Sequence, residues 1–172
     1  YSPLSLGRYL RDMWVLGYDA EDIATNIAFW TKHHAAVQRA KAEAAEAFKT
    51  YPQTYEFMAG GKTGIVLKTD NRFFTQAAVK TGKYQFRVIV SSTKHVTITT
   101  HRVDLSALAE KLNQMEPGRW YYQPVMHALM NGGPQYVGTP ATKLSYVAIV
   151  DMIQEAFGRP KFGPTKRSNG KK

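Results

Sequence analysis

The residues best suited to chemistry lie in a glycine-rich stretch, MNGGPQYVGTP, at positions 130–140. Its asparagine and two consecutive glycines can adopt positive φ angles and expose successive backbone N–H groups. Such a run of donors binds anions, and a hydroxyl and a lysine follow closely. The pattern therefore predicts a phosphate-binding loop, although a plain structural turn would use the same residues. The candidate site residues are Asn131, Gly132, Gly133, Thr142 and Lys143.

Basic and aromatic side chains precede this loop in the segment GRWYYQPVMH. Arg119 adds a guanidinium, a group that binds phosphate oxygens through paired hydrogen bonds. Trp120, Tyr121 and Tyr122 can stack on nucleobases, and the same rings can equally fill a hydrophobic core. Together with the loop, they predict a partner that carries phosphate, either single-stranded nucleic acid or a nucleotide.

The sequence shows no arrangement of residues that would support catalysis. Its aspartates form no D-x-D pair, and the adjacent His33 and His34 would point about 100° apart on a helix, too far to share a metal ion. The segment GGKTG resembles the end of a nucleotide-binding loop, but it lacks the upstream glycine and precedes a strand-like run. No serine lies in a nucleophile elbow. We therefore expect no catalytic residues, no metal site and no cofactor in this chain.

The net charge of +10 is concentrated at the C-terminus. The last fourteen residues, RPKFGPTKRSNGKK, contain six of these charges and no acid, which leaves +4 for the other 158 residues. Residues 159–172 are predicted to be a disordered basic tail because they are rich in glycine, proline and polar residues. Such a tail, which includes Lys166 and Arg167, can neutralise phosphates without reading sequence or can serve solubility alone.

The composition excludes several classes of protein. With 44% hydrophobic and 12% aromatic residues across 172 positions, the chain can build a core. No apolar run approaches the roughly 18 residues of a membrane span, and the first residues do not resemble a signal peptide. Cysteine is absent, which excludes disulfides and thiolate metal sites and favours a reducing, cytoplasmic location.

Residues 1–52 predict a helical arm. A short helix over Leu4–Leu16 would stop at Gly17, and Asp19 can cap a long helix that ends before Pro52. Within the long helix, apolar and small residues recur at about the 3.5-residue spacing of a coiled-coil seam. We expect the seam to be buried against the following domain or against a second chain, which would give a homo-oligomer. Its large apolar members are Ile23, Ile27, Trp30, Val37 and Phe48.

Residues 53–158 predict an α+β domain for substrate binding. The segments TGIVLKT, YQFRVIV and HVTITTHRV have strand composition, and the last two would form a hairpin around Ser91–Lys94. RFFTQAAV between the first two is a strand or a short helix. Asp104 and Ser145 each precede a run with helical apolar spacing. Strands followed by helices predict a small mixed or antiparallel sheet with helices on one face.

The segment VIVSSTKHVTITTHRVDLSALAEKL, followed by a double-glycine loop, resembles the C-terminal domain of DHH-family phosphoesterases. That family includes enzymes that degrade oligonucleotides and single-strand exonucleases. Asp104, Leu105 and Ser106 match the family's Asp-Val-Ser helix cap, and RYLRDMW near the N-terminus is similar to a segment that precedes its linker helix. The resemblance covers most of the chain and implies that the glycine loop contacts a substrate phosphate or terminal base.

The chain also departs from this family. Its loop reads Asn131-Gly132-Gly133-Pro134, without the family's third glycine and histidine. The catalytic half, whose Asp clusters and Asp-His-His motif hold two divalent metals, does not occur in these residues. The resemblance therefore implies the substrate-binding part of a larger enzyme, or a degenerate relative. Mn²⁺ or Mg²⁺ would be required only by a catalytic half upstream.

Two functions remain open from the sequence. The first is a nucleic-acid or nucleotide phosphate-binding domain that does not hydrolyse phosphodiesters by itself. The alternative is a non-enzymatic protein-interaction or oligomerisation module that acts through the helical arm, with a purely structural glycine loop.

Overall fold

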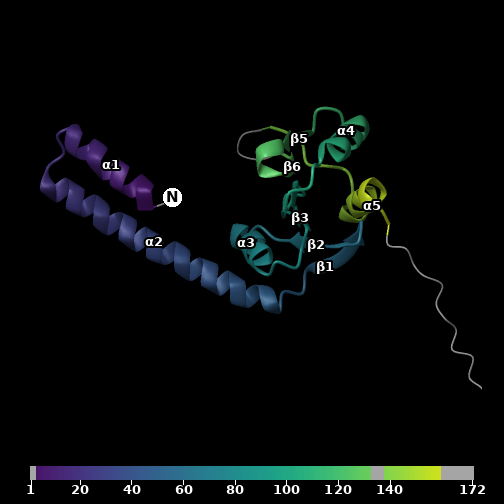
Figure 1. The fold of residues 1–172 in the computed structure, drawn as a ribbon, viewed down its shortest axis with the longest axis horizontal. Helices are drawn as coiled ribbons and strands as arrows, with labels where there is room; N and C mark the ends of the chain where they lie inside the picture. The colour runs from purple at the N-terminus through teal and green to yellow at the C-terminus, as the bar shows by residue number, and fades with distance from the viewer. Residues whose placement is uncertain (1–2, 133–137, 160–172) are drawn as a thin grey trace, which may run out of the picture. The chain divides into compact units, whose positions relative to one another are not determined.

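The computed structural model describes residues 3–132 and 138–159, which form an α+β structure with a helical N-terminal region, as expected (Figure 1). No helix in these residues is long and apolar enough to cross a membrane. The helices described are α1 (Pro3–Val15), α2 (Ala20–Lys49), α3 (Arg72–Lys80), α4 (Ser106–Met115) and α5 (Tyr146–Phe157). The strands are β1 (Thr54–Ala59), β2 (Lys62–Lys68), β3 (Phe86–Val90), β4 (Val96–Thr100), β5 (Trp120–Gln123) and β6 (Ala128–Asn131), and a 3₁₀ turn, η1 (Pro124–Met126), joins β5 to β6.

Contacts within the chain define two compact units, divided inside α2 between Glu43 and Ala44. The sequence alone placed this division after Pro52, at the end of the helix. The last turns of α2 belong to the second unit because the ring of Phe48 packs edge-on against Phe74, with 6.2 Å between the ring centroids. A continuous helix therefore contributes to both units.

The first unit consists of α1 and most of α2. Asp19 caps α2 as expected, since its Oδ1 accepts hydrogen bonds of 2.9 Å from two backbone N–H groups of the first turn. Tyr9 of α1 packs edge-on against Trp30 of α2 at 6.2 Å. Among the side chains described in this unit, Met13 alone is fully buried, and the predicted seam residue Ile27 is exposed in the single chain. Burial of the seam thus stays a prediction about an assembled state.

The described part of the second unit contains a six-stranded sheet in the order β1-β2-β3-β4-β6-β5. Strands β2 and β3 are parallel and are connected through α3, whereas every other neighbouring pair in this sheet is antiparallel. Because β4 is antiparallel to both β3 and β6, strand β6 runs in the same direction as β2 and β3. The C-terminal residues of these three strands, Lys68, Val90 and Asn131, therefore lie at one end of the sheet, called here the carboxyl end.

Helices cover both faces of this sheet (Figure 1). On one face, α4 and α5 pack against residues such as Val66 and Ile98 and form the main core. On the other face, Ile65 and Leu67 pack with Ala78 of α3. The expectation of helices on one face therefore holds for α4 and α5 but not for α3. The connection between two parallel strands has to cross one face of the sheet. Because α4 and α5 cover one face, the connection from β2 to β3 crosses the opposite face and places α3 there.

The other predicted elements agree with the structure in most places. RFFTQAAV is the helix α3, and the hairpin around Ser91–Lys94 joins β3 to β4. Ser145 caps α5 by accepting from the N–H of Ala148 at 3.1 Å. Asp104 accepts from the N–H of Ser106 at 2.9 Å, one residue before the cap position of α4. Sequence reasoning did not identify β1, β5 or β6 as strands.

Candidate functional site

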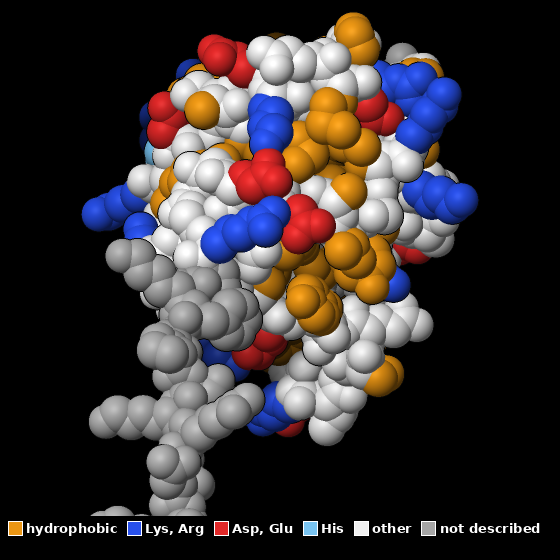
Figure 2. Space-filling view, turned by 90° about the vertical axis from the view of Figure 1, so that its right-hand side faces the viewer, with side chains coloured by type: hydrophobic (Ala, Val, Ile, Leu, Met, Phe, Trp, Pro, Cys, Tyr) orange, Lys and Arg blue, Asp and Glu red, His pale blue; other side chains and the backbone are white. Residues whose placement is uncertain are grey.

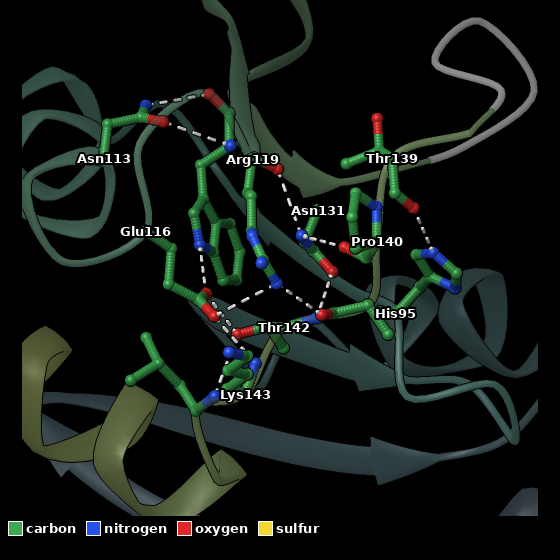
Figure 3. Close-up of polar contacts among 12 residues, drawn as sticks. His95, Asn113, Glu116, Arg119, Asn131, Thr139, Pro140, Thr142 and Lys143 are labelled. Atoms are coloured by element: carbon green, nitrogen blue, oxygen red, sulfur yellow. Dashed lines mark hydrogen bonds and ion pairs between the residues drawn. The ribbon is translucent and has the colours of Figure 1, made fainter.

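A buried carboxylate, Glu116, organises the segment that the sequence singled out as a ligand loop (Figure 3). Glu116 follows α4 directly, and only 6% of its surface is exposed. Its Oε2 accepts hydrogen bonds from Trp120 Nε1 at 3.0 Å and from Thr142 Oγ1 at 2.5 Å. Its Oε1 accepts from the backbone N–H of Lys143 at 2.7 Å, and Arg119 Nη1 lies 3.8 Å away. Donors from the start of β5 and from the segment after the loop therefore surround one carboxylate.

The pKa of the Glu116 carboxyl is lowered by these contacts. Burial alone would raise this pKa, because it withdraws the charged form from water. Hydrogen bonds from Thr142, from the backbone of Lys143 and from Trp120, together with the charge of Arg119, act in the opposite direction and outweigh burial. Glu116 is therefore ionised at neutral pH, and these donors hold a carboxylate of the chain itself.

The predicted site residues Arg119, before the loop, and Thr142 and Lys143, after it, differ in their surroundings. Thr142 is buried, and its hydroxyl donates to Glu116. Arg119 is half-buried, and its Nη1 also donates to the carbonyl of Ala141 at 3.1 Å. The side chain of Lys143 is exposed, although its backbone N–H donates to Glu116. Of these residues, Lys143 thus presents its side chain to solvent.

Asn131 ties the end of β6 to the segment that returns toward α5 (Figure 3). Only 1% of its surface is exposed. Its Nδ2 donates to the carbonyls of Arg119 and Pro140 at 3.1 and 3.3 Å, and its Oδ1 accepts from the N–H of Thr142 at 2.8 Å. All of these bonds lie within the domain, so the Asn131 side chain supports the loop from inside.

Gly132 begins the loop with a φ of 78°, in the left-handed region that favours glycine. A Cβ at this position would lie 2.5 Å from Cδ2 of His95, which follows the β3–β4 turn. His95 Nε2 lies 3.1 Å from the carbonyl oxygen of Thr139, so the histidine ring is seated between the two ends of the loop. Gly133 lies outside the described residues, as do Lys166 and Arg167 of the predicted tail.

Two hollows open at the carboxyl end of the sheet, and both have Lys68 in their walls. The strand-end hollow has a volume of about 390 Å³ and is lined by residues that include Tyr51, Lys68, Thr69, Asp70, Ser91 and Ser92. The aromatic hollow has a volume of about 450 Å³ and is lined by residues that include Gln53, Thr54, Tyr55, Val66, Lys68 and Tyr146. Both fall within the range of about 300–1,000 Å³ that is usual for ligand sites.

The charges at these hollows come from Lys68 and Asp70. Lys68 Nζ lies 4.2 Å from the centroid of the Tyr146 ring, and no carboxylate of the described residues lies within ion-pair distance of it. Asp70 Oδ1 accepts from the N–H of Ser92 at 3.0 Å. The backbone and side-chain hydrogen bonds of Ser92 lower the pKa of the Asp70 carboxyl, so it is ionised at neutral pH. Asp70 thus links the β2–α3 connection to the β3–β4 turn.

Sequence reasoning missed Lys68, Tyr55 and Tyr146 as candidate site residues. The signal that could have found Lys68 is the order of strand, helix and strand from TGIVLKT to YQFRVIV, which is typical of a parallel crossover. Polar residues just beyond the C-terminus of such a strand are where open sheets bind ligands. Tyr55 and Tyr146 lie 91 residues apart, so only the folded chain brings them together.

The described residues contain no group of three or more histidine, aspartate or glutamate side chains that could hold a metal ion. Comparisons of the chain with models of protein families, with curated proteins and with solved structures gave no match.

Proposed function

We propose that this domain binds the phosphate of a nucleotide or of single-stranded nucleic acid at the carboxyl end of its sheet. The observation that carries this proposal is the position of Lys68, an ammonium group in the walls of both hollows with no carboxylate partner among the described residues. Ligands of open sheets bind beyond the C-terminal ends of parallel strands, and a lysine there provides the charge that phosphate requires.

A neighbouring hydroxyl group can add a hydrogen bond to such a phosphate. The Oγ1 of Thr69 accepts from the N–H of Asn71 at 3.0 Å, which leaves its own proton available for donation. Ser92 lines the same hollow from the β3–β4 turn, and its side chain is engaged with Asp70. Thr69, on the β2–α3 connection, is therefore the hydroxyl that can donate to a phosphate beside Lys68.

The predicted glycine loop belongs to the same proposal, because β6 also ends at the carboxyl end of the sheet. Lys143 would supply a second positive charge through its exposed side chain. The internal contacts of Asn131, Thr142 and Arg119 would hold the loop in place, with Gly132 and Gly133 presenting backbone donors. In this arrangement Glu116 accepts from Trp120, Thr142 and the N–H of Lys143, so these three donors hold the loop and do not contact the ligand.

The resemblance to DHH-family phosphoesterases supports a role in substrate binding and not in hydrolysis. We propose that the chain binds nucleic acid or nucleotide without cleaving it, with Mn²⁺ or Mg²⁺ required only by a catalytic half elsewhere. Residues 159–172 would add charge that is independent of sequence.

The test is a titration of a short fluorescent single strand against the Lys68→Met variant, at two salt concentrations. Loss of a charged hydrogen bond should weaken binding about tenfold and reduce the salt slope by about 0.7. Lys62→Met is the matched control, because it removes the same charge from the other end of β2, about 20 Å away. Equal binding by both variants and the wild type would refute this site. Truncation after Gly158 should weaken binding without removing its dependence on Lys68.

The sign of the charge that the hollow accepts is tested by Asp70→Asn. Asparagine keeps an oxygen that can accept from the N–H of Ser92, so the turn is retained while one negative charge is removed. Binding of the oligonucleotide should become tighter by several-fold. Weaker binding would show that the Asp70 carboxylate does not repel the ligand and would contradict a phosphate bound in this hollow.

A second candidate function is favoured by the exposed apolar residues of the first unit. Trp14, Leu16 and Phe29 are 68%, 75% and 63% exposed, more than monomeric helices usually leave in water. These side chains would suit an interface with another helix. The arm would then serve protein interaction or oligomerisation. Measurement of the molecular mass in solution distinguishes this role from nucleic-acid binding.

A further inference from the structure

An exposed tyrosine, Tyr55, and a partly buried one, Tyr146, form an aromatic pair beside Lys68. Tyr55 lies on the edge strand β1 and is 54% exposed, and Tyr146 is the first residue of α5. Their ring centroids are 6.5 Å apart, with 61° between the ring planes. Figure 2 shows hydrophobic side chains gathered on the face that carries these elements, with both basic and acidic side chains around them. The ring of Tyr55 therefore lies open to a ligand that approaches from solvent, with the partly buried ring of Tyr146 beside it.

The core of the domain does not account for Tyr55. Phe57, two residues along β1, is buried in the main core, whereas more than half of Tyr55 is in water. Tyr146 is partly buried against that core, and its ring also meets the ring of Tyr55. Within the described part of the chain, neither tyrosine hydroxyl has a hydrogen-bond partner. An exposed ring on an edge strand adds little to stability, so the position of Tyr55 beside a hollow calls for another role.

The walls of the aromatic hollow match a flat ring with polar edges. Val66 provides an apolar wall, the two tyrosine rings provide aromatic surface, and Gln53 and Thr54 provide polar groups. A volume of about 450 Å³ leaves room for a heteroaromatic ring together with part of its sugar. Nucleobases combine these features, and they stack on aromatic side chains with little preference for sequence.

Lys68 connects this hollow to the proposed phosphate site. Its ammonium lies 4.2 Å from the centroid of the Tyr146 ring and is in the walls of both hollows. A base in the aromatic hollow would therefore place its own phosphate, or the next one along a strand, close to a positive charge.

We infer that the aromatic hollow is a nucleobase subsite, in which one base stacks on one ring of the Tyr55–Tyr146 pair and meets the other ring edge-on, while its phosphate contacts Lys68. This subsite depends on the phosphate site proposed above and specifies its ligand as a unit of base and phosphate. A free nucleotide and the end of a single strand share this chemistry.

The experiment compares two fluorescent strands of equal length, a thymidine oligonucleotide and an abasic strand that has the same phosphates but no bases. The wild-type chain should bind the thymidine strand about 10- to 100-fold more tightly, which is the range for one or two stacked bases. Tyr146→Leu and Tyr55→Leu should each reduce thymidine binding toward the abasic level and leave abasic binding unchanged. Tyr146→Phe keeps the ring and should bind as the wild type does. Unchanged thermal unfolding curves would confirm that each variant is folded.

The outcomes separate the two proposals. Equal binding of both strands by the wild type, with loss of both in Lys68→Met, would leave the phosphate site standing and refute the base subsite. No binding of either strand would refute both. Competition by thymidine monophosphate distinguishes a free nucleotide from a single strand as the ligand. At a site for free nucleotides, the monophosphate would displace the strand at a concentration similar to that of the strand. At a strand-binding site, displacement would require a far higher concentration of the monophosphate.

Discussion

At the scale of single residues, Glu116 determines how the loop after β6 is held. Three donors from Trp120, Thr142 and Lys143 converge on a carboxylate that is 6% exposed. Removing such a carboxylate leaves buried donors without an acceptor, and each unsatisfied group costs about 1–3 kcal/mol. The loop, the end of α4 and the start of α5 therefore share one charged centre.

We expect Glu116→Ala to lower the free energy of unfolding by about 3–5 kcal/mol, the range for breaking a buried charged contact. Glu116→Gln should cost less, because the amide keeps one acceptor oxygen for the backbone N–H of Lys143. Urea unfolding at neutral pH measures both values. If Glu116→Ala lowers the free energy of unfolding by less than about 1 kcal/mol, water has replaced the carboxylate as the acceptor for the three donors.

The same residue predicts a pH dependence of stability. The folded protein lowers the pKa of Glu116, so its stabilising effect is complete above the pKa of an unfolded-chain glutamate, about 4.3. That effect is lost as the pH falls through the lower pKa of the folded state. The difference in unfolding free energy between the wild type and Glu116→Gln should therefore shrink as the solution is acidified. A constant difference down to strongly acidic pH would contradict the lowered pKa.

At the scale of elements, the loop after β6 meets the β3–β4 turn through Gly132 and His95. Gly132→Ala should destabilise the protein by about 1–3 kcal/mol, because its φ of 78° is strained for alanine and its new Cβ would approach the histidine ring. His95→Ala removes the ring but not the backbone strain. In the double variant, the cost of Gly132→Ala should fall by at least about 0.5 kcal/mol. Strictly additive losses in thermal unfolding would mean that the ring moves aside freely.

The sequence predicted those elements whose signals are local. The helices α1, α2, α4 and α5 have apolar spacing, and α2 and α5 also have polar capping residues. The β3–β4 hairpin has two long strand-like runs. Strands β5 and β6 have four residues each and are separated by the turn that begins at Pro124, so neither is long enough to show alternation. Their place in the sheet comes from the pairing of β6 with β4 and of β5 with β6, which no local pattern specifies.

The candidate site was predictable only in part, for the same reason. Asn131, Gly132, Thr142 and Lys143 stand out by type and spacing, and the structure brings them to one end of the sheet. Whether a polar side chain faces a ligand or a buried partner depends on tertiary contacts. Glu116 is an example, because in the sequence it is part of the segment EPG, which predicts only the end of a helix. Lys68 likewise gains its position from the parallel pairing of β2 with β3, between residues that are distant in sequence.

At the scale of the whole molecule, the first unit has little to stabilise it by itself. Two helices bury one described side chain, Met13, while large apolar groups such as Trp14 remain in water. Most of the stability of a helix in a protein comes from packing an apolar face, and isolated helices are marginal. An arm of this kind is expected to pack against a partner, and the arm of a second copy offers the same apolar surface.

We therefore expect the chain to form a dimer through residues 1–43, with a mass in solution of twice 19.4 kDa. Trp14→Glu places a charge in that interface and should shift the mass to that of one chain, because an exposed side chain can be replaced without disturbing the monomer. Thr25→Glu is the control, since it adds the same charge at another exposed position without removing apolar surface. Light scattering over a range of concentrations measures all three proteins. A wild-type chain that stays monomeric at high concentration would exclude self-association and leave the exposed groups of α1 and α2 for a different protein.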